Sequence, residues 1–434
     1  MKALLLTDSE YKTDIFDALY GQVTHLLEQA GYEITVKELD KTVHYCIGCF
    51  CCWVKTPGEC VIRDDMTEIN RLYINSDAVV ILSPVIFGQF SANIKNALDR
   101  LLPRLLPFFI RRADGSTGHP FRYAKNPELF IIGYGSNLNK NDINLFNAVT
   151  INHRPGAKIC VYEGPQDTNE ITALFGQNYR IPAQPEADIQ DRETMPEPGE
   201  IPESCSCRKK VVFINASPRA QDRTASASFI ARAEKQFDDT LFEKEVIQVR
   251  KIPDNQRESA FEKIRTADAV VFVFPLYVYC LPGMLTRFLR DYAAFLEKTG
   301  QKQNSTAVYT IVNCGFPEPY INEEAEDVIK SFCRQTGMKF RSGILIGGGV
   351  MITAAEKAPP VQKLLKQLDE AFLAVTADIL APGTLQVKDV QVRINFPHGL
   401  FYFIGSLNWK AQAKHNGLKV RDMYRRPYGE NATL

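Results

Sequence analysis

Residues 77–84 read DAVVILSP, and residues 268–275 read DAVVFVFP. Each is a nearly continuous apolar run that ends at a proline, which is the pattern of a strand buried on both faces of a parallel sheet. A segment with helical spacing follows each run, at residues 91–102 and at residues 282–296. Because the same order of elements occurs twice, we interpret the chain as a diverged internal repeat. Two unrelated α/β domains with a chance match are the alternative.

Further strands and helices alternate around each of the two runs. In the first half we expect a helix at 14–29 and strands at 2–7, 32–39, 129–134 and 157–162. In the second half we expect strands at 210–215, 243–249, 307–312 and 341–346, and helices at 224–237, 323–336 and 360–380. Strands that alternate with helices form a doubly wound parallel sheet. The sequence therefore predicts an α/β protein with two such five-stranded sheets in tandem.

Composition divides the chain into domains. Between residues 175 and 208, prolines lie among acidic residues with few large apolar side chains, which is typical of an extended linker. We therefore expect domains at 1–175 and 209–385, joined by a linker at 176–208. Residues 386–434 are expected to form a basic C-terminal tail, which either docks on its own domain or contacts a membrane surface or a partner.

Charge and hydropathy exclude several classes of protein. The 51 Lys and Arg residues balance the 51 Asp and Glu residues, which argues against broad electrostatic binding to nucleic acid or to a membrane surface. The N-terminal apolar run is too short for a signal peptide, and no window approaches the roughly 20 apolar residues of a transmembrane segment. We therefore expect a cytoplasmic protein. In that reducing compartment, the 11 cysteines should serve metal or redox chemistry rather than disulfides.

Residues 44–65, HYCIGCFCCWVKTPGECVIRDD, contain closely spaced cysteines. Three are separated by two residues each, and a fourth follows after seven more residues. This spacing lets thiolates surround a small centre, and soft sulfur ligands select iron–sulfur clusters or zinc. We favour a 4Fe-4S cluster, with structural zinc or a metal-free loop of redox thiols as the alternatives. Cys51 is left out because its neighbour takes the ligand position. The expected ligands are Cys46, Cys49, Cys52 and Cys60.

Three loops of the second half each follow an expected strand. Residues 213–224, FINASPRAQDRT, offer hydroxyls, arginines and a helix N-terminus to a phosphate, with a plain capped helix start as the alternative. Residues 275–283, PLYVYCLPG, offer two tyrosines either to a flat ring or to a neighbouring strand. Because the carboxyl ends of parallel strands meet at one edge, these loops and residues 313–317 predict a single ligand crevice. The expected binding residues are Ser217, Arg219, Arg223, Thr224, Pro275, Leu276, Tyr277, Tyr279, Asn313 and Gly315.

These motifs resemble those of a known family. Residues 46–100, with the cysteine spacing, CVIRDDM and DAVVILSPVIFGQFSANIKNALDR, resemble the iron–sulfur flavoproteins of the NADPH-dependent FMN reductase superfamily. The second half, with SPR, RT, PLYVY and VNCGFPEP, resembles the same superfamily without the cysteine insert. The resemblance implies a flavodoxin-like fold, bound FMN, a cytoplasmic location and oligomers. It also implies that the four cysteines form the compact cluster motif, that the first loop binds the FMN phosphate, and that the loop after the third strand lies at the flavin ring.

One loop departs from the family pattern. Residues 7–14, TDSEYKTD, carry three acids against one lysine, Lys12, and would repel a phosphate. Ile86 also stands where the family often has an aromatic residue. We therefore expect a division of labour, with the metal centre in the first domain and FMN in the second.

The predicted function is that of a flavin-dependent oxidoreductase. Electrons would pass from NAD(P)H or another donor through FMN, and through the iron–sulfur cluster, to a small-molecule or protein acceptor. No side chain is singled out as a catalytic acid or base. An electron carrier without substrate turnover and a non-redox scaffold are the alternatives. We expect a homo-oligomer and no nucleic-acid partner.

Overall fold

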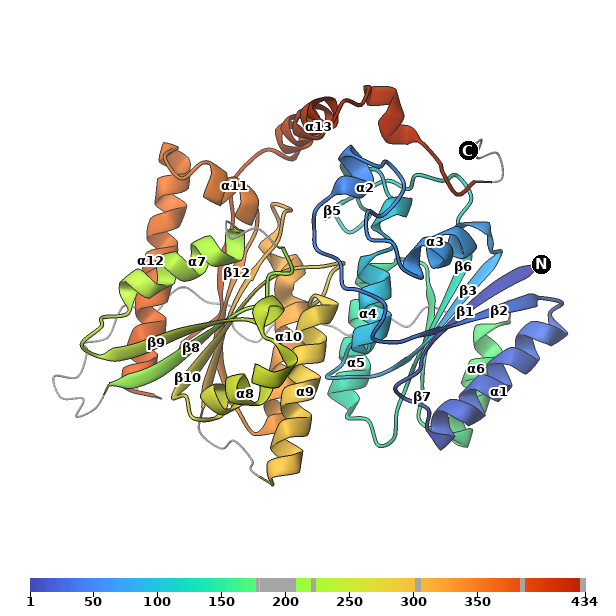
Figure 1. The fold of residues 1–434 in the computed structure, drawn as a ribbon, viewed down its shortest axis with the longest axis horizontal. Helices are drawn as coiled ribbons and strands as arrows, with labels where there is room; N and C mark the ends of the chain where they lie inside the picture. Colours follow the sequence, from blue (N-terminus) through green and yellow to red (C-terminus); the bar gives the residue numbers. More distant parts are fainter. Residues whose placement is uncertain (177–178, 180–207, 220–223, 301–305, 383–386, 430–434) are drawn as a thin grey trace. The chain divides into compact units, whose positions relative to one another are not determined.

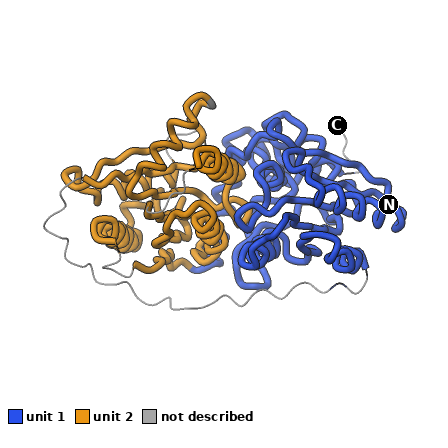
Figure 2. The backbone as a smooth tube through the Cα atoms, turned by 90° about the horizontal axis from the view of Figure 1, so that it is seen from below, with its two compact units in different colours: residues 1–185, 397–434 blue, residues 186–396 orange. Residues whose placement is uncertain are grey.

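The computed structural model describes residues 1–176, 179, 208–219, 224–300, 306–382 and 387–429. These residues belong to two compact units (Figure 2): unit 1 comprises residues 1–185 and 397–434, and unit 2 comprises residues 186–396. Each unit contains a parallel sheet with helices on both faces (Figure 1). The prediction of two doubly wound α/β sheets in tandem is therefore confirmed. The predicted linker, 176–208, lies almost entirely outside the described residues.

The sheet of unit 1 has five strands in the order β2-β1-β3-β6-β7, and all neighbours are parallel. This order brings the carboxyl ends of β1 and β3 together at the point where the chain reverses direction across the sheet, which is where such folds bind ligands. The strands are β1 (Lys2–Asp8), β2 (Glu33–Leu39), β3 (Ala78–Pro84), β6 (Glu128–Tyr134) and β7 (Lys158–Tyr162), with a small antiparallel pair formed by β4 (Ile110–Arg111) and β5 (Thr117–Gly118).

Helices cover both faces of this sheet (Figure 1). One face is covered by α1 (Asp14–Gln29) and α6 (Thr168–Leu174), and the other by α3 (Met66–Asn75), α4 (Ala92–Asp99) and α5 (Lys140–His153). Thr13 caps α1 by accepting a hydrogen bond from the backbone N–H of Phe16 at 3.3 Å. An apolar stripe of α1 that includes Leu19 and Val23 packs on the sheet, and all seven residues of β3 are buried. The other helices of unit 1 are α2 (Cys51–Val54), η1 (Leu102–Arg104), η2 (Pro165–Asp167), α13 (His398–His415) and η7 (Val420–Tyr424).

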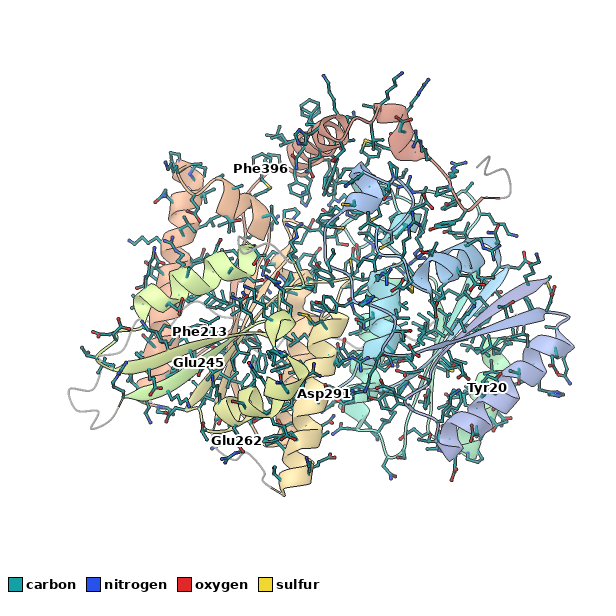
Figure 3. All side chains as sticks on the ribbon, viewed as in Figure 1. Tyr20, Phe213, Glu245, Glu262, Asp291 and Phe396 are labelled. Atoms are coloured by element: carbon teal, nitrogen blue, oxygen red, sulfur yellow. The ribbon has the colours of Figure 1, made fainter. Side chains whose placement is uncertain are left out.

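The sheet of unit 2 has six parallel strands in the order β13-β12-β11-β10-β8-β9. They are β8 (Lys209–Asn215), β9 (Phe242–Gln248), β10 (Ala269–Pro275), β11 (Ala307–Asn313), β12 (Lys339–Ile346) and β13 (Val390–Val392). The helices are α7 (Ala225–Ala233) and α12 (Pro359–Leu380) on one face, α8 (Arg257–Arg265), α9 (Gly283–Thr299) and α10 (Glu323–Thr336) on the other, and α11 (Gly349–Ala354) after β12. Short turns of 3₁₀ helix lie at η3 (Glu234–Gln236), η4 (Val249–Lys251), η5 (Asp254–Gln256) and η6 (Pro319–Asn322). Phe213 of β8, labelled in Figure 3, is part of the buried core between the sheet, α7 and α12.

The C-terminal part differs from expectation in two ways. The second sheet gains a sixth strand, β13, which pairs with β12 and buries Val392; three residues are too few to show a strand period in the sequence. Residues 397–429, called the C-terminal segment below, are also not a tail of the second domain, because they belong to unit 1. Phe401, Trp409 and Ala413 of α13 find apolar partners in unit 1, and their burial accounts for the position of the segment. No helix in the described ranges is long and apolar enough to cross a membrane.

Candidate functional site

The loop after β10 forms a tight turn at the carboxyl edge of the sheet of unit 2. Tyr277 and Cys280 exchange two backbone hydrogen bonds, at 2.9 and 3.0 Å. The two residues between them, Val278 and Tyr279, have positive φ angles of 45° and 60°. Non-glycine residues in this region are strained and often occur at functional sites. Tyr277 and Tyr279 are half-buried, so part of each ring is accessible at the sheet edge.

The loop after β3 of unit 1 makes the same turn. Ile86 and Gln89 exchange backbone hydrogen bonds at 2.8 and 3.0 Å, and Phe87 and Gly88 have φ angles of 55° and 78°. Here, however, a side chain of α5 covers the turn. A Cβ atom added to Gly88 would lie 2.7 Å from the side chain of Leu145 of α5, and Phe87 is only 6% exposed. The turn of unit 1 therefore has no accessible aromatic surface.

The loops after the first strands also differ. In unit 2, residues 216–224 connect β8 to α7, whereas in unit 1 the shorter loop of residues 9–13 connects β1 to α1. At the end of β8, the side chain of Asn215 accepts a hydrogen bond from the backbone N–H of Ser217 at 3.1 Å. Thr224 caps α7 by accepting from the N–H of Ala227 at 3.1 Å. This loop therefore contains neutral polar groups next to a helix N-terminus, which suits an anion.

The corresponding position in unit 1 is an acid. The carboxylate of Asp8 at the end of β1 is completely buried, and it accepts hydrogen bonds from the hydroxyl of Ser91, from the amide of Asn93 at 2.8 Å and from the N–H of Glu10 at 3.0 Å. These donors satisfy the carboxylate, but its negative charge remains at the place where a phosphate would bind. The structure therefore supports the expectation that this loop is unsuited to a phosphate.

Asn313 ties the three loops of unit 2 together. Its side-chain amide donates to the hydroxyl of Ser226 at 3.1 Å and to the carbonyl of Phe274 at 3.1 Å. Its own carbonyl accepts from the N–H of Leu276 at 2.8 Å. One residue thus connects the N-terminus of α7 with the ends of β10 and β11. Ser226 and this network were not anticipated from the sequence, although the position of Asn313 at a strand end was.

A glycine run packs beside Asn313. A Cβ atom on Gly349 would lie 3.1 Å from the side chain of Asn313, and a Cβ atom on Gly347 would lie 2.3 Å from the carbonyl oxygen of Pro317. Gly348 has a φ angle of 69°. The run therefore allows the backbone after β12 to lie against the loop after β11, which is a packing role.

The predicted binding residues of unit 2 are thus brought to one edge of its sheet, with one exception. Arg223 lies outside the described residues. Ser217, Thr224 and Asn313 are less than 10% exposed. The others are Arg219, Pro275, Leu276, Tyr277 and Tyr279, which are half-buried, and Gly315, which is exposed.

The four predicted cysteine ligands also come together. The loop after β2 leads through Phe50, which has a φ angle of 55°, into α2, so that the chain turns sharply between the cysteines. Burial, helped by the charges of Asp99, Cys60 and Cys49, raises the pKa of Cys46 to about 12. Burial also raises the pKa of Cys52, as do the charges of Cys46, Cys60 and Cys49. The four thiols therefore lie near enough for one charged sulfur to destabilise the others.

Cys51 forms a hydrogen bond with Cys49. Burial, the charge of Cys49 and this hydrogen bond together raise the pKa of Cys51 to about 11. No set of three or more His, Cys, Asp or Glu side chains in the described ranges is arranged to hold a metal ion. The thiols are gathered, therefore, without a finished coordination shell.

Arg100 holds both ends of the cysteine segment. Its guanidinium is buried, donates to the carbonyls of His44 at 3.2 Å and Ile62 at 3.0 Å, and pairs with Asp64. It also reaches the sulfur of Cys60 at 3.5 Å. Burial opposes the charge of Arg100, but its bonds to Asp64 and Cys60 outweigh this and raise its pKa. The sequence analysis did not find this residue; its only signal was an arginine directly after an apolar helix.

The C-terminal segment forms a wall of the cysteine site. Cys52 and Trp53 pack in an apolar cluster with Ala413 and Met423. Arg122 is buried beside them and donates to the carbonyls of Met423 at 2.6 Å and Arg425 at 2.9 Å. Burial lowers the pKa of Arg122 to about 10, and its positive charge in turn lowers the pKa of Cys52.

Each half of the chain matches a known protein family. Residues 1–119 match the family described as NADPH-dependent FMN reductase, and residues 209–371 match the family described as flavodoxin-like fold. The first half is thus similar to the NADPH-dependent FMN reductase family, and the second half has the flavodoxin-like fold. The sequence interpretation of the family and of the fold is therefore confirmed.

Iron–sulfur flavoproteins are among the curated proteins to which the chain is similar. One from Archaeoglobus fulgidus is 38% identical over 104 residues, which is 24% of this chain and 46% of that protein. One from Methanocaldococcus jannaschii is 32% identical over 116 residues, which is 26% of this chain and 59% of that protein. The chain spans about half the length of the curated relatives it matches.

Solved structures of flavin-linked proteins also align with about two fifths of the chain. A structure described as an NADH:FMN oxidoreductase in its apo form has a TM-score of 0.31 and 15% identity, and covers 42% of this chain and 95% of its own. An NAD(P)H:quinone oxidoreductase from Methanothermobacter marburgensis has a TM-score of 0.28 and 13% identity, and covers 39% of this chain and 96% of its own.

Proposed function

We propose that the chain is a flavin-dependent oxidoreductase in which unit 2 binds FMN and unit 1 binds a 4Fe-4S cluster. The observation that carries the proposal is the difference between the two sheet edges. In unit 2 the end of β8 carries the uncharged Asn215 and the turn after β10 carries half-buried tyrosines, whereas the edge of unit 1 carries a buried carboxylate and a covered turn. The matches to the two families support a flavin, and the names of the relatives in the preceding section support an iron–sulfur cluster beside it.

The residues of unit 2 fit a flavin phosphate. Ser217 contributes a hydroxyl, and Arg219 contributes a cation on the same loop. The N-terminus of α7, capped by Thr224, adds the positive end of a helix dipole. Asn215 keeps the strand end neutral, so the loop can accept two negative phosphate charges.

The turn after β10 fits the ring. The rings of Tyr277 and Tyr279 offer flat surfaces at the sheet edge, and the two backbone hydrogen bonds between Tyr277 and Cys280 hold the turn in its strained conformation. Asn313 fixes this turn relative to the phosphate loop through Ser226. Bound there, FMN would supply hydride acceptance and single-electron release. The role of the protein is to orient the ring and to exclude water from one of its faces.

The four thiols of unit 1 fit an iron–sulfur cluster. They are soft donors, they are gathered in one place, and as free thiolates they would repel one another. Binding iron removes this repulsion, because a coordinated thiolate shares its charge with the metal. Arg100 donates toward Cys60, and Arg122 offers a positive charge near Cys52. Cys46, Cys49, Cys52 and Cys60 would be the ligands, and the cluster would supply one-electron storage.

The test is anaerobic purification of the full chain, followed by an absorbance spectrum and assays for flavin, iron, sulfide and zinc. We expect bound FMN together with iron and sulfide, and oxidation of NADH or NADPH when an artificial acceptor such as ferricyanide is added. Colourless protein would overturn the proposal. Yellow protein without iron would remove the cluster and keep the flavin. Stable reduced flavin without turnover would show an electron carrier instead of an enzyme.

A further inference from the structure

Helix α13 packs on unit 1 with one side only. Phe401 lies against the ring of Phe109 at a centroid distance of 5.1 Å, and Trp409 lies against Trp53 at 5.2 Å. Between them, Gly405 allows a close approach, because a Cβ atom there would lie 2.3 Å from the ring of Phe109. This inner side is the one that covers the cysteine segment.

The opposite side of α13 is also apolar. Leu400, Phe403, Ile404 and Leu407 are 46%, 61%, 46% and 48% exposed. Their spacing of three, four and seven residues places them in one stripe on a helix, on the side away from Phe401 and Trp409. Four large exposed apolar side chains in one stripe form a patch that a protein surface rarely leaves without a binding role.

The stripe continues into a basic region. Lys410 and Lys414 follow on the same side of the helix, one and two turns after Leu407. A hollow of about 470 Å³ lies here, lined by Lys410, Ala411, Lys414, Gly417, Leu418, Lys419 and Val420. Its wall thus contains three lysines and no acid.

Charge is concentrated in this segment. Residues 397–429 contain six Lys and Arg residues and one acid, Asp422, although the chain as a whole is neutral. That acid is already engaged by the N–H of Lys419 at 2.8 Å and by Arg425 at 3.1 Å. The segment therefore presents a positive surface that needs negative charge from outside.

We infer that α13 and the residues up to Tyr424 form a surface that docks on an anionic lipid bilayer. An apolar stripe flanked by lysines is the pattern of helices that lie in the membrane interface, with the apolar side chains among the acyl chains and the lysines at the phosphates. Charge complementarity selects this occupant, because a bilayer with anionic headgroups offers apolar and negative groups side by side. Val420 and Tyr424, which are 46% and 49% exposed, would add apolar contact. Docking would place α2 and its cysteines beside the membrane.

Co-sedimentation of the full chain with vesicles tests this inference. One set of vesicles is phosphatidylcholine alone, and the other is phosphatidylcholine mixed with an equal amount of phosphatidylglycerol. We expect binding to the mixed vesicles only, weakened by salt. The double variant Lys410→Ala/Lys414→Ala should weaken binding about 30-fold, since each lysine near an anionic surface contributes about a factor of five. The double variant Phe403→Ser/Leu407→Ser should abolish it.

Matched controls lie on α12 of unit 2. Leu373→Ser removes another exposed leucine, and Lys366→Ala removes another exposed lysine; neither should change vesicle binding. Unchanged iron and flavin contents in the α13 variants show that the chain still folds. Equal binding to both kinds of vesicle, or none to either, would overturn the inference. So would a change from dimer to monomer in Phe403→Ser/Leu407→Ser without vesicle binding, because the stripe would then contact a second copy.

Discussion

At the carboxyl edge of their sheets, units 1 and 2 have the same turn in opposite surroundings. Both turns contain a pair of exchanged backbone hydrogen bonds around two residues with positive φ. In unit 2 the rings of Tyr277 and Tyr279 are half-buried, whereas in unit 1 Leu145 closes over Gly88. The turn of unit 1 thus has the same backbone conformation as the turn of unit 2, but it is not accessible. The conservation of a turn conformation between two domains does not by itself indicate that both bind the same ligand.

The cluster proposed for unit 1 lies instead in a segment that unit 2 lacks. The cysteine segment follows β2. Arg100 binds it through hydrogen bonds to two of its carbonyls, and the C-terminal segment packs against it. Unit 2 has no comparable cysteine cluster in its sequence. The comparison leads to four predictions, which begin with the largest expected effect.

Single cysteine substitutions should distinguish the proposed ligands from Cys51, which is not one of them. Cys52→Ser should cause near-complete loss of bound iron and sulfide, because a cluster held by four thiolates lacks one of them. Cys51→Ser is the matched control, with the same chemistry one residue away, and should keep its iron. Iron and sulfide assays and the absorbance of the cluster measure both. If Cys51→Ser loses iron while Cys52→Ser keeps it, the ligand set is wrong.

Exchanging the residues at the ends of β1 and β8, Asp8 and Asn215, should exchange the charge at the two sheet edges. Asn215→Asp places the acid of unit 1 in unit 2 and keeps the acceptor for Ser217. An added negative charge beside a bound phosphate costs about 3 kcal/mol or more at an effective dielectric constant of 20, so the Kd for FMN should rise at least about 100-fold.

The reciprocal variant is Asp8→Asn, which removes the buried charge of unit 1. It should leave the amount of bound FMN unchanged, because Leu145 still covers the turn. Titration of flavin-free protein with FMN, followed by fluorescence, measures both variants. An unchanged Kd in Asn215→Asp, or a new FMN site in Asp8→Asn, would contradict the assignment of the flavin to unit 2.

Acid should destabilise unit 1 more than unit 2. All six histidines belong to unit 1, and burial lowers the pKa of His119 to about 4 and the pKa of His153 well below its usual value. Nearby arginines and Lys95 lower the pKa of His153 further. Unfolded histidines titrate near pH 6.5. The unfolded chain therefore binds protons first, and stability is lost as the pH falls from about 6.5 toward 4.

From pH 7 to pH 5, His119 should lower the free energy of unfolding of unit 1 by about 2 kcal/mol, and His153 should act in the same direction. Both tryptophans, Trp53 and Trp409, lie in unit 1, so tryptophan fluorescence during urea unfolding reports this unit alone. His119→Phe should reduce the pH dependence by about 2 kcal/mol over this range. A pH dependence that is the same in His119→Phe would assign the effect to other groups.

The smallest effect concerns strain in the turn. Val278 has a β-branched side chain at a φ angle of 45°, so Val278→Asn should stabilise unit 2 by about 1 kcal/mol, because Asn tolerates this conformation. The same change in unit 1, Phe87→Asn, removes a buried ring and should destabilise that unit by about 3 kcal/mol. Chemical denaturation measures both. Equal effects in the two units would contradict the difference in burial.

The sequence alone determined the class of the fold, and it predicted where the chemistry would lie. The runs at 77–84 and 268–275 predicted buried parallel strands, because a strand covered on both faces must be apolar throughout. The acids of the loop at 7–14 predicted a poor phosphate site, because the charge of a loop can be read directly from its own residues. The spacing of the cysteines predicted a cluster segment for the same reason.

Only the tertiary structure decided which parts of the chain meet. Packing brings Arg100 to the segment at 44–65, and it brings Trp409 to Trp53. These residues are far apart in the sequence, and no periodic pattern encodes such contacts. Leu145 closes the turn of unit 1 from another helix, and the C-terminal segment returns to unit 1 although it follows unit 2 along the chain. These outcomes depend on which apolar surfaces are complementary in shape, and that complementarity exists only after folding.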